Sequence, residues 1–256
     1  GTIIGNTLLG SDAGPIGIGV YDGAWAETRD NSLNRHYSSV EYYGMSGNPA
    51  SNMEISGLNI SNATKGISIT YATNMSIHNN RISGTFNWGI YLDYVSNSAI
   101  RNNYLFNSTS IGAGSVHMTS SSNLLIFNNS ILNFSTNGIY LISTTNSTVR
   151  GNLVSSNIRN STNGIALWWR ATNNTIGGPA PEDGNAIYLS ASGEVENHLV
   201  YLGDSENYGN VVQNNVLNGG MRAIQQGDSI AGTNYFSSNS IGASTPPSFA
   251  GILLIA

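Results

Sequence analysis

The chain lacks cysteine altogether and is poor in charged residues. Without cysteine, disulfide bonds and thiolate metal sites are excluded, and cysteine usage says nothing about the redox compartment. Only 9% of the 256 residues are charged, about a third of the share in typical globular proteins. The net charge is −5, and the basic residues, including the single lysine Lys65, form no cluster. A nucleic-acid partner is therefore not expected.

Long apolar runs are missing as well. No apolar stretch approaches the roughly 18 residues that a membrane-spanning helix needs, and the apolar segment 249–256 is too short, so no membrane span is expected. Low charge could indicate a disordered polar tract. The apolar residues nevertheless follow a strict spacing, which favours a folded chain.

The chain does contain a repeated phrase. Residues 74–82, 97–105 and 123–131 all read Asn-x-x-apolar-x-x-Asn-x-apolar, and the phrase returns every 22 to 27 residues through the middle of the chain. A unit this short cannot bury its own apolar face, so it must stack on neighbouring copies.

Aligning the phrases gives columns of equivalent residues. The central apolar residue, the register mark, is Ile55, Ile77, Ile100, Ile126, Val149, Ile176, Val212 or Phe236. Asparagine follows three residues later at positions 80, 103, 129, 152, 215 and 239, and an apolar residue follows five later. About ten residues before the mark lies a Gly-apolar-x-apolar segment, as at 66–69, 89–92, 138–141 and 164–167.

These segments predict short strands with one buried face. Strands joined by Asn and Gly turns at a fixed period form a solenoid, in which equivalent strands of successive coils lie parallel and about 4.8 Å apart. Each asparagine amide can then bond the coils above and below. Such a bond contributes ~1 kcal/mol, against about 1.5–3 kcal/mol for a buried Ile or Leu. The apolar columns therefore supply stability, and the asparagines set the turn and the register.

The repeat resembles the right-handed parallel β-helix family, the pectate-lyase-like superfamily, over most of residues 52–256. The phrases at 173–178 and 184–187 are similar to one common in microbial cell-surface members. We expect an all-β, right-handed parallel β-helix of about ten coils with an asparagine ladder and no clear terminal caps. This superfamily includes lyases, hydrolases, epimerases, adhesins and structural proteins, so the fold alone does not select a function.

We interpret 1–256 as a single β-helix domain with two long excursions. Residues 21–51 break the repeat, and residues 178–198 contain prolines and several carboxylates. Long loops on a rigid solenoid are the usual place for function. Carboxylates of the first excursion could form a site or lie on a solvated loop; they are Asp22, Glu27, Asp30 and Glu41.

One face of the Gly-apolar strands is rich in aromatic residues. The candidate ligand-binding residues on it and just beyond it are Tyr91, Asp93, Tyr94, His117, Tyr140, Trp168, Trp169 and Arg170. Aromatic rings and a carboxylate on a flat sheet could hold sugar rings by stacking. The same residues could instead form ladders that stabilise the sheet, or they could bury an interface.

The catalytic motifs that the resemblance implies for enzymes are absent. Lyases of this kind need several carboxylates on one sheet to hold calcium, with an Arg or Lys base nearby. Hydrolases need two or three acidic residues on adjacent rungs, whereas Asp93 stands nearly alone on its face. We therefore assign no catalytic residue, no metal ligand and no cofactor. The sequence leans towards a non-enzyme and leaves the question open.

The ends of the sequence show no capping segment. The chain opens without methionine on coil residues Ile3, Ile4 and Leu8, and it closes on an unfinished coil at Ile252, Leu253, Leu254 and Ile255. Uncapped coils expose apolar core and strand edges. The sequence is therefore either cut from a longer protein, or these residues form head-to-tail contacts between copies, which build open filaments.

These features predict a non-catalytic extracellular or cell-surface structural protein that self-associates into a filament, sheath or surface layer. The alternative is a carbohydrate-binding or polysaccharide-degrading β-helix protein, a lyase or hydrolase, that uses the aromatic face and has a polysaccharide as its partner. A phage or adhesin fibre segment is a third reading.

Glycosylation is expected along one edge of the solenoid. Asn62, Asn107 and Asn133 each lie seven residues after a register mark, Asn160 lies nearby in its own coil, and all four begin an Asn-x-Ser/Thr triplet. For an exported protein the expected intact mass exceeds the 27.1 kDa of the polypeptide. Mass spectrometry of the native protein checks this, and a mass equal to the bare chain contradicts it.

Overall fold

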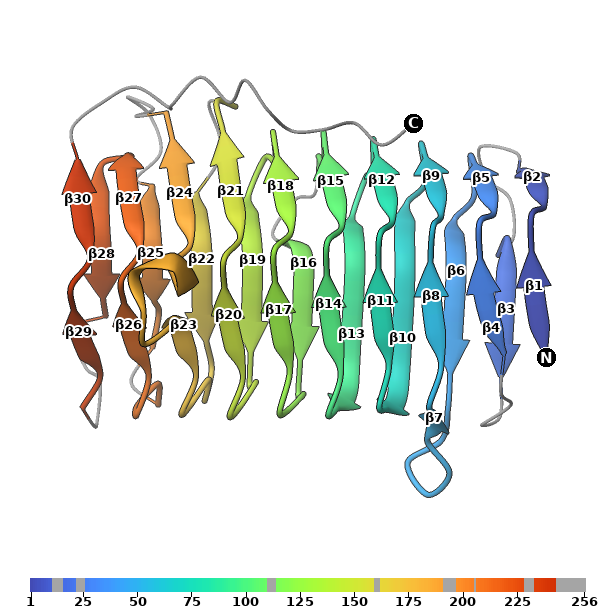
Figure 1. The fold of residues 1–256 in the computed structure, drawn as a ribbon, viewed down its shortest axis with the longest axis horizontal. Coiled ribbons are helices and arrows are strands. Elements are labelled where there is room, and N and C mark those ends of the chain that lie inside the picture. The colour runs from blue at the N-terminus through green and yellow to red at the C-terminus, as the bar shows by residue number, and fades with distance from the viewer. Residues whose placement is uncertain are drawn as a thin grey trace.

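The computed structural model describes residues 1–10, 16–21, 26–109, 114–158, 162–190, 197–204, 206–227 and 233–242. Three parallel sheets run the length of the molecule and wrap around one core, as Figure 1 shows. Each coil contributes one strand to each sheet in a fixed order, so the chain forms the parallel β-helix that the sequence predicts. The described residues hold a single helical segment, the short 3-10 helix η1 (Pro181–Asp183).

Sheet A carries the register marks. Its strands are β1 (Thr2–Ile4), β4 (Glu27–Arg29), β8 (Glu54–Ser56), β11 (Ser76–His78), β14 (Ala99–Arg101), β17 (Leu125–Phe127), β20 (Thr148–Arg150), β23 (Thr175–Gly177), β26 (Val211–Gln213) and β29 (Tyr235–Ser237). Sheet B carries the next apolar column. Its strands are β2 (Thr7–Leu9), β5 (Ser32–Asn34), β9 (Asn59–Ser61), β12 (Arg81–Ser83), β15 (Tyr104–Phe106), β18 (Ser130–Leu132), β21 (Leu153–Ser156), β24 (Ala186–Leu189), β27 (Val216–Gly219) and β30 (Ser240–Gly242).

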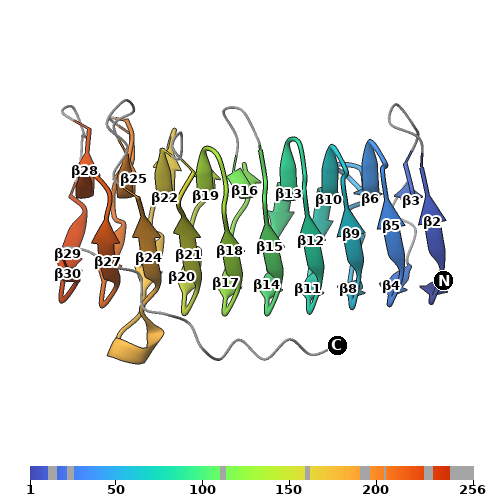
Figure 2. The ribbon, with the colours of Figure 1, turned by 90° about the horizontal axis from the view of Figure 1, so that it is seen from above.

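Sheet C holds the Gly-apolar segments and has the longest strands, up to nine residues. Its strands are β3 (Ile18–Tyr21), β6 (Ser38–Tyr43), β7 (Ala50–Ser51), β10 (Lys65–Thr73), β13 (Trp88–Ser96), β16 (Gly114–Thr119), β19 (Asn137–Ile142), β22 (Asn163–Trp168), β25 (His198–Leu202) and β28 (Arg222–Gln226). Figure 2, seen from above, shows these strands along one side of the solenoid and η1 standing out on the side away from them.

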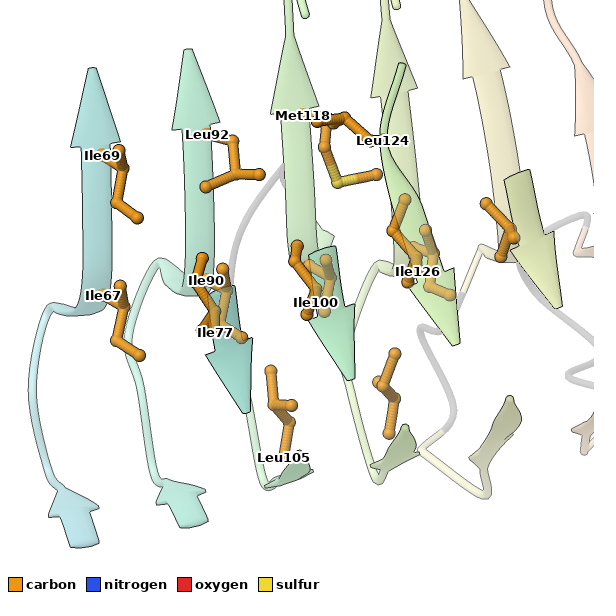
Figure 3. Packing of buried hydrophobic residues seen from close by; sticks show 14 of the residues in the cluster. Ile67, Ile69, Ile77, Ile90, Leu92, Ile100, Leu105, Met118, Leu124 and Ile126 are labelled. Carbon is orange, nitrogen blue, oxygen red and sulfur yellow. The ribbon is translucent and has the colours of Figure 1, made fainter. Parts of the chain in front are cut away.

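The core is a set of aliphatic columns. Ile55, Ile77 and Ile100 stack in register on sheet A, and all are at most 1% exposed. Sheet C adds two columns, represented by Ile67 and Ile69, which face the sheet A marks across the interior in Figure 3. Because a side chain stacks on its equivalent in the next coil, one repeated pattern fills the whole interior.

The asparagine ladder is present and buried. Asn103 donates from both its backbone N–H and its side-chain amide to Oδ1 of Asn129, and Asn129 does the same to Asn152. The column continues to Asn80 at one end and to Asn185, Asn215 and Asn239 at the other. The predicted bonding of each amide to the neighbouring coils is therefore confirmed.

A second ladder was not predicted. Asn174, Asn210 and Asn234 stack in the same way at the turn that precedes sheet A. In an earlier coil Ser147 occupies this position. Its side chain has no amide, but its backbone N–H donates to Oδ1 of Asn174 and so joins the end of the ladder. Among the described residues this ladder occupies only the last coils, so its asparagine repeats too few times in the sequence for a period to be recognised.

Two corrections concern the expected excursions. Within 21–51, strands β4, β5 and β6 form a regular coil. Among the described residues 26–51 the chain leaves this coil between β6 and β7, where a hairpin bridged by Met45 and Asn48 projects beside β7 in Figure 1. The mark of this coil is Thr28, fully buried, which hydrogen bonds the buried Tyr42 hydroxyl at 2.5 Å. A polar pair replaces the usual aliphatic pair, so a search for apolar marks misses the coil.

The second expected excursion, 178–198, is mostly coil as well. Residues 178–184 leave the solenoid through η1, and Asn185 and β24 then return to the ladder and to sheet B. The insertion places Asn185 nine residues after its mark Ile176 rather than three. Asp183 at the end of η1 pairs with Arg150 of the preceding coil, which holds the insertion against sheet A. Residues 191–196 lie outside the described part of the chain.

Many turns place a residue in the left-handed region. Asparagine occupies it in most columns, as at Asn74, Asn97 and Asn123, with φ of 51° to 55°. The column three residues earlier differs, because Tyr71 and Tyr94, inside β10 and β13, adopt φ of 51° and 52° there. A side chain of this size in that region costs roughly 1–2 kcal/mol, whereas asparagine tolerates it.

Truncating one ladder residue tests the role of the ladder. Asn129→Ala removes the acceptor of Asn103 and the donor to the Ile100 carbonyl, leaving buried polar groups unpaired. We expect the free energy of unfolding to fall by roughly 3 kcal/mol, measured by urea denaturation. The control Asn59→Ala, at an exposed strand position, should change it by less than about 0.5 kcal/mol. Equal losses in both variants would contradict a structural ladder.

Candidate functional site

The outward face of sheet C gathers the aromatic residues in register. Side chains alternate along each strand, so the residues between the buried aliphatic positions point outward. One outward row pairs Ser68, Tyr91, His117, Tyr140, Ala166 and Tyr201 on successive strands. The next row pairs Thr70, Asp93, Thr119, Ile142 and Trp168. Stacking of the coils therefore brings together residues that lie more than twenty positions apart in the chain.

The rings of this face touch one another. Trp88 stacks on Tyr91 at 4.4 Å between centroids, His117 meets Tyr91 at 5.4 Å, and His117 meets Tyr140 at 5.0 Å. Further along, Tyr201 stacks on His198 at 4.8 Å and lies 5.6 Å from Trp168. We call these residues the aromatic strip: Trp88, Tyr91, His117, Tyr140, Trp168, His198 and Tyr201. At one end, Nζ of Lys65 lies 5.0 Å from the Trp88 ring.

Hydrogen bonds link two residues of the strip, Tyr91 and His117, through their neighbours in the next outward row. The Tyr91 hydroxyl donates to Asp93 and accepts from the Thr119 hydroxyl. The Thr119 hydroxyl lies 3.1 Å from Nε2 of His117. Because that hydroxyl hydrogen is used on Tyr91, Thr119 must accept from Nε2–H, which leaves Nδ1 of neutral His117 without a proton.

Burial shifts the pKa values of this chain of groups. Desolvation lowers the pKa of His117 to about 4, so the ring is neutral at pH 7. Desolvation, followed by the charge of Asp93, raises the pKa of Tyr91 to about 12. Burial also raises the pKa of Asp93, partly offset by the hydrogen bond from Tyr91. Opposed shifts of neighbouring groups in one place are typical of functional sites.

Three buried polar atoms at this point of the face have no hydrogen-bond partner. They are Nε1 of Trp88, Oδ1 of Asp93 and Nδ1 of His117. Buried polar atoms are normally satisfied, and an unpaired one costs about 1–3 kcal/mol. Three such atoms on two adjacent strands provide a donor and two acceptors for a polar ligand.

The structure divides the predicted site residues into two groups. Tyr91, Asp93, His117, Tyr140 and Trp168 lie on the outward face of sheet C. The other three adopt positive φ: Tyr94, inside β13, and Trp169 and Arg170, directly after β22.

Sequence reasoning missed four contributors to this face: Lys65, Trp88, His198 and Tyr201. Lys65 and Trp88 pair in register, each three residues before an outward position, Ser68 or Tyr91, and strict alternation along the strand does not reach them. Tyr201 follows the coil whose insertion displaced the register, and His198 begins the same strand.

Other predicted sites have these positions. Asn62, Asn107 and Asn133 are exposed and lie in one turn, with φ between 52° and 56°, so glycosylation there stays a prediction. Asn160 lies outside the described residues. In the described ranges, no group of three His, Cys, Asp or Glu side chains could hold a metal ion. The same ranges contain no helix with the length and hydropathy for crossing a bilayer.

Comparisons with known proteins agree with the fold. The family model described as "Right handed beta helix region" matches residues 1–154. No curated protein sequence matches the chain. Solved structures with the same architecture include the periplasmic alginate epimerase AlgG, 13% identical, with a TM-score of 0.66 over 87% of this chain and 61% of that one. The chain thus spans 61% of the length of AlgG.

Two other solved structures are similar. The surface protein and adhesin PfbA of Streptococcus pneumoniae is 13% identical, with a TM-score of 0.60 over 94% of this chain and 78% of that one. The A-module of the mannuronan C-5 epimerase AlgE6 of Azotobacter vinelandii is also 13% identical, with a TM-score of 0.53 over 96% of this chain and 81% of that one. Identities this low establish a common fold only.

The predicted function needs a correction. The similar structures reported above are two epimerases and an adhesin, and none of the three is named as a filament component. The prediction of a non-catalytic, self-assembling structural protein is therefore wrong. The assembly role given to Ile3, Ile4 and Leu8 belonged to that prediction and is not carried further; residues 252–255 lie outside the described part.

The low pKa of His117 predicts an acid-sensitive fold. Unfolded histidine binds a proton near pH 6.5, but folded His117 binds it only near pH 4. Its contribution to stability is therefore complete above pH 6.5 and falls by roughly 3 kcal/mol as the pH drops to 4. Urea denaturation at pH 7 and pH 4 should show a smaller loss for His117→Gln than for the unaltered chain. Equal losses would contradict a buried neutral His117.

Proposed function

Because the chain belongs to the right-handed β-helix family, we propose that it binds polysaccharide along the aromatic strip of sheet C. The observation that carries the proposal is the cluster of Trp88, Tyr91, His117 and Tyr140 together with three unpaired buried polar atoms on strands β13 and β16. Ring faces suit the apolar faces of sugars, and the unpaired atoms suit their hydroxyl or carboxyl groups.

The shape of the strip fits an extended polymer. It runs across the strands from β13 to β25, four strand spacings or about 19 Å along the solenoid axis. Both of its ends carry rings, with Trp88 beside Lys65 at one end and Tyr201 with His198 at the other. A linear sugar chain that lies parallel to the axis meets both ends at once, whereas a single sugar reaches only one.

The proposed polymer contains uronic acid residues. Lys65 supplies a cation at the edge of the strip, and the indole N–H of Trp88 is an unused donor that could bind a carboxylate oxygen. The net charge of the chain is −5 and would repel an acidic polymer, so the electrostatic attraction of the uronate groups has to come from local groups such as Lys65. AlgG is an alginate epimerase and AlgE6 is a mannuronan C-5 epimerase, which supports a test with alginate.

A second candidate function is removal of a proton from the bound uronate. His117 carries the observation that favours it, since its neutral ring offers an unprotonated Nδ1. A carboxylate bound beside the ring would raise its low pKa and so strengthen it as a base. The hydroxyls of Tyr91 and Tyr140 have raised pKa values, so they stay protonated and can act as acids. Proton removal next to a carboxyl group is the first step of either elimination or epimerisation.

The proposed location is outside the cytoplasm, at the cell surface or in the periplasm. AlgG is periplasmic and PfbA is a surface protein, and extracellular polymers are found in these places. A polysaccharide outside the cytoplasm would reach the strip there without crossing the inner membrane.

Affinity electrophoresis in alginate tests the binding function. Tyr140→Ala should weaken retardation by about tenfold in dissociation constant, because one stacked ring contributes ~1.4 kcal/mol. The matched control is Tyr104→Ala, which removes a half-buried ring from sheet B and should leave binding unchanged. An unaltered chain that alginate does not retard would refute the proposal.

Proton exchange tests the second candidate. Incubation of alginate with the protein in D₂O should place deuterium on the carbon next to the carboxyl group, visible by NMR for elimination and epimerisation alike. His117→Gln should slow this by at least about 100-fold while binding stays within a few-fold. Binding without any deuterium uptake would leave the strip as a binding surface and reject the chemistry.

A further inference from the structure

The segment that leads from sheet C into the following turn contains unfavourably placed aromatic residues. In register, the residues after the row of Asp93 are Tyr71 and Tyr94, inside β10 and β13, and Ser120, Ser143 and Trp169, directly after β16, β19 and β22. All five have positive φ, between 41° and 52°. The backbone adopts this conformation in five successive coils, whether the side chain is tyrosine, serine or tryptophan.

At most other left-handed positions the solenoid uses asparagine or glycine. Three residues further along, or four in the coil of Trp169, the left-handed positions are Asn74, Asn97, Asn123, Asn146 and Asn173. Asparagine and glycine tolerate this conformation, and a bulky aromatic residue does not. Stability alone would therefore favour asparagine at 71, 94 and 169. Strained residues that persist at one place point to a role other than stability.

The aromatic side chains of this turn form a short exposed row. Tyr71 stacks on Tyr94 with centroids 4.8 Å apart and an angle of 16°, and Tyr43 meets Tyr71 edge-on at 6.3 Å. The row stops at Tyr94, because the next two coils carry only Ser120 and Ser143. Tyr94 is 52% exposed, so the face of its ring away from Tyr71 meets small side chains and solvent.

Trp169 stands on the far side of the two serines. It is 63% exposed, and three strand spacings, about 14 Å, separate its coil from that of Tyr94. Beside it, Arg170 pairs with Glu206. Two exposed rings thus flank a polar stretch of the turn, directly beyond the Asp93 end of the sheet C face.

We propose that this turn is a second sugar-binding site, in which pyranose rings of the bound polysaccharide stack on the open face of Tyr94 and on Trp169. The inference rests on the proposed polysaccharide function and extends it from the sheet to its edge. Tyr94 directly follows Asp93 in the chain, so a polymer on the aromatic strip has sugar units or branches within reach of the turn. The backbone strain is then the consequence of placing rings where a ligand needs them.

The substitution Tyr94→Asn separates function from stability. Asparagine relieves the left-handed strain but removes the stacking ring. We expect the melting temperature to stay the same or rise by up to about 4 °C. We expect the dissociation constant for alginate, measured by affinity electrophoresis, to rise about three- to tenfold. A purely structural aromatic row would give the opposite pair of results, a lower melting temperature and unchanged binding.

Ser120→Asn is the matched control, because it makes the same change to the same turn one coil away without removing a ring. It should raise the melting temperature and leave alginate binding unchanged. If Tyr140→Ala weakens binding and Tyr94→Asn does not, the second site is refuted while the proposed function stands. If alginate does not bind the unaltered chain, both are refuted. Tyr94→Ser, which copies the residue at Ser120, gives an independent binding measurement should the asparagine variant misfold.

Discussion

The structure depends on the in-register hydrogen bonding of parallel coils. Each backbone segment pairs with its equivalent one coil away, so each side chain must stack on its equivalent as well. Aliphatic columns accept this because identical branched side chains pack well on one another. Asparagine columns accept it because one amide carries both a donor and an acceptor, and Asn103, Asn129 and Asn152 use both. A residue that could not tolerate its own copy about 4.8 Å away would break the stack.

The same constraint builds the aromatic strip. Outward residues of sheet C also stack, and Tyr91, His117 and Tyr140 become neighbours although each belongs to a different coil. Their rings shield one another and the groups beneath them from water, which keeps His117 neutral and raises the pKa of Tyr91 to about 12. A flat, repetitive scaffold can thus produce a site with perturbed chemistry without any long loop. The expected excursion 21–51 is largely a coil, with β4, β5 and β6 in the three sheets.

Turns and strands resolve the constraint differently. Almost any residue adopts the extended backbone of a strand without strain, so the outward rows of the strands can carry the side chains that a ligand requires. Positions with positive φ are demanding, and asparagine or glycine fills most of them. Tyr71 and Tyr94, inside β10 and β13, and Trp169, directly after β22, share one column that departs from that rule. The backbone conformation in this column favours asparagine or glycine, but the residues present are aromatic. Such disagreements between local preference and sequence tend to occur at functional sites.

The sequence alone determined the register marks, the main asparagine ladder and the outward row from Ser68 to Ala166. It could do so because parallel stacking converts a spacing along the chain directly into a column in space. Only the tertiary structure decided where that conversion fails. Thr28 and Tyr42 take the places of two buried aliphatic residues, and their hydroxyl groups hydrogen bond to each other. The insertion before Asn185 lengthens the spacing between this ladder residue and its register mark. The unpaired Nδ1 of His117 and the ring contacts of Trp88 and Tyr201 likewise depend on side-chain packing between coils, which spacing does not encode.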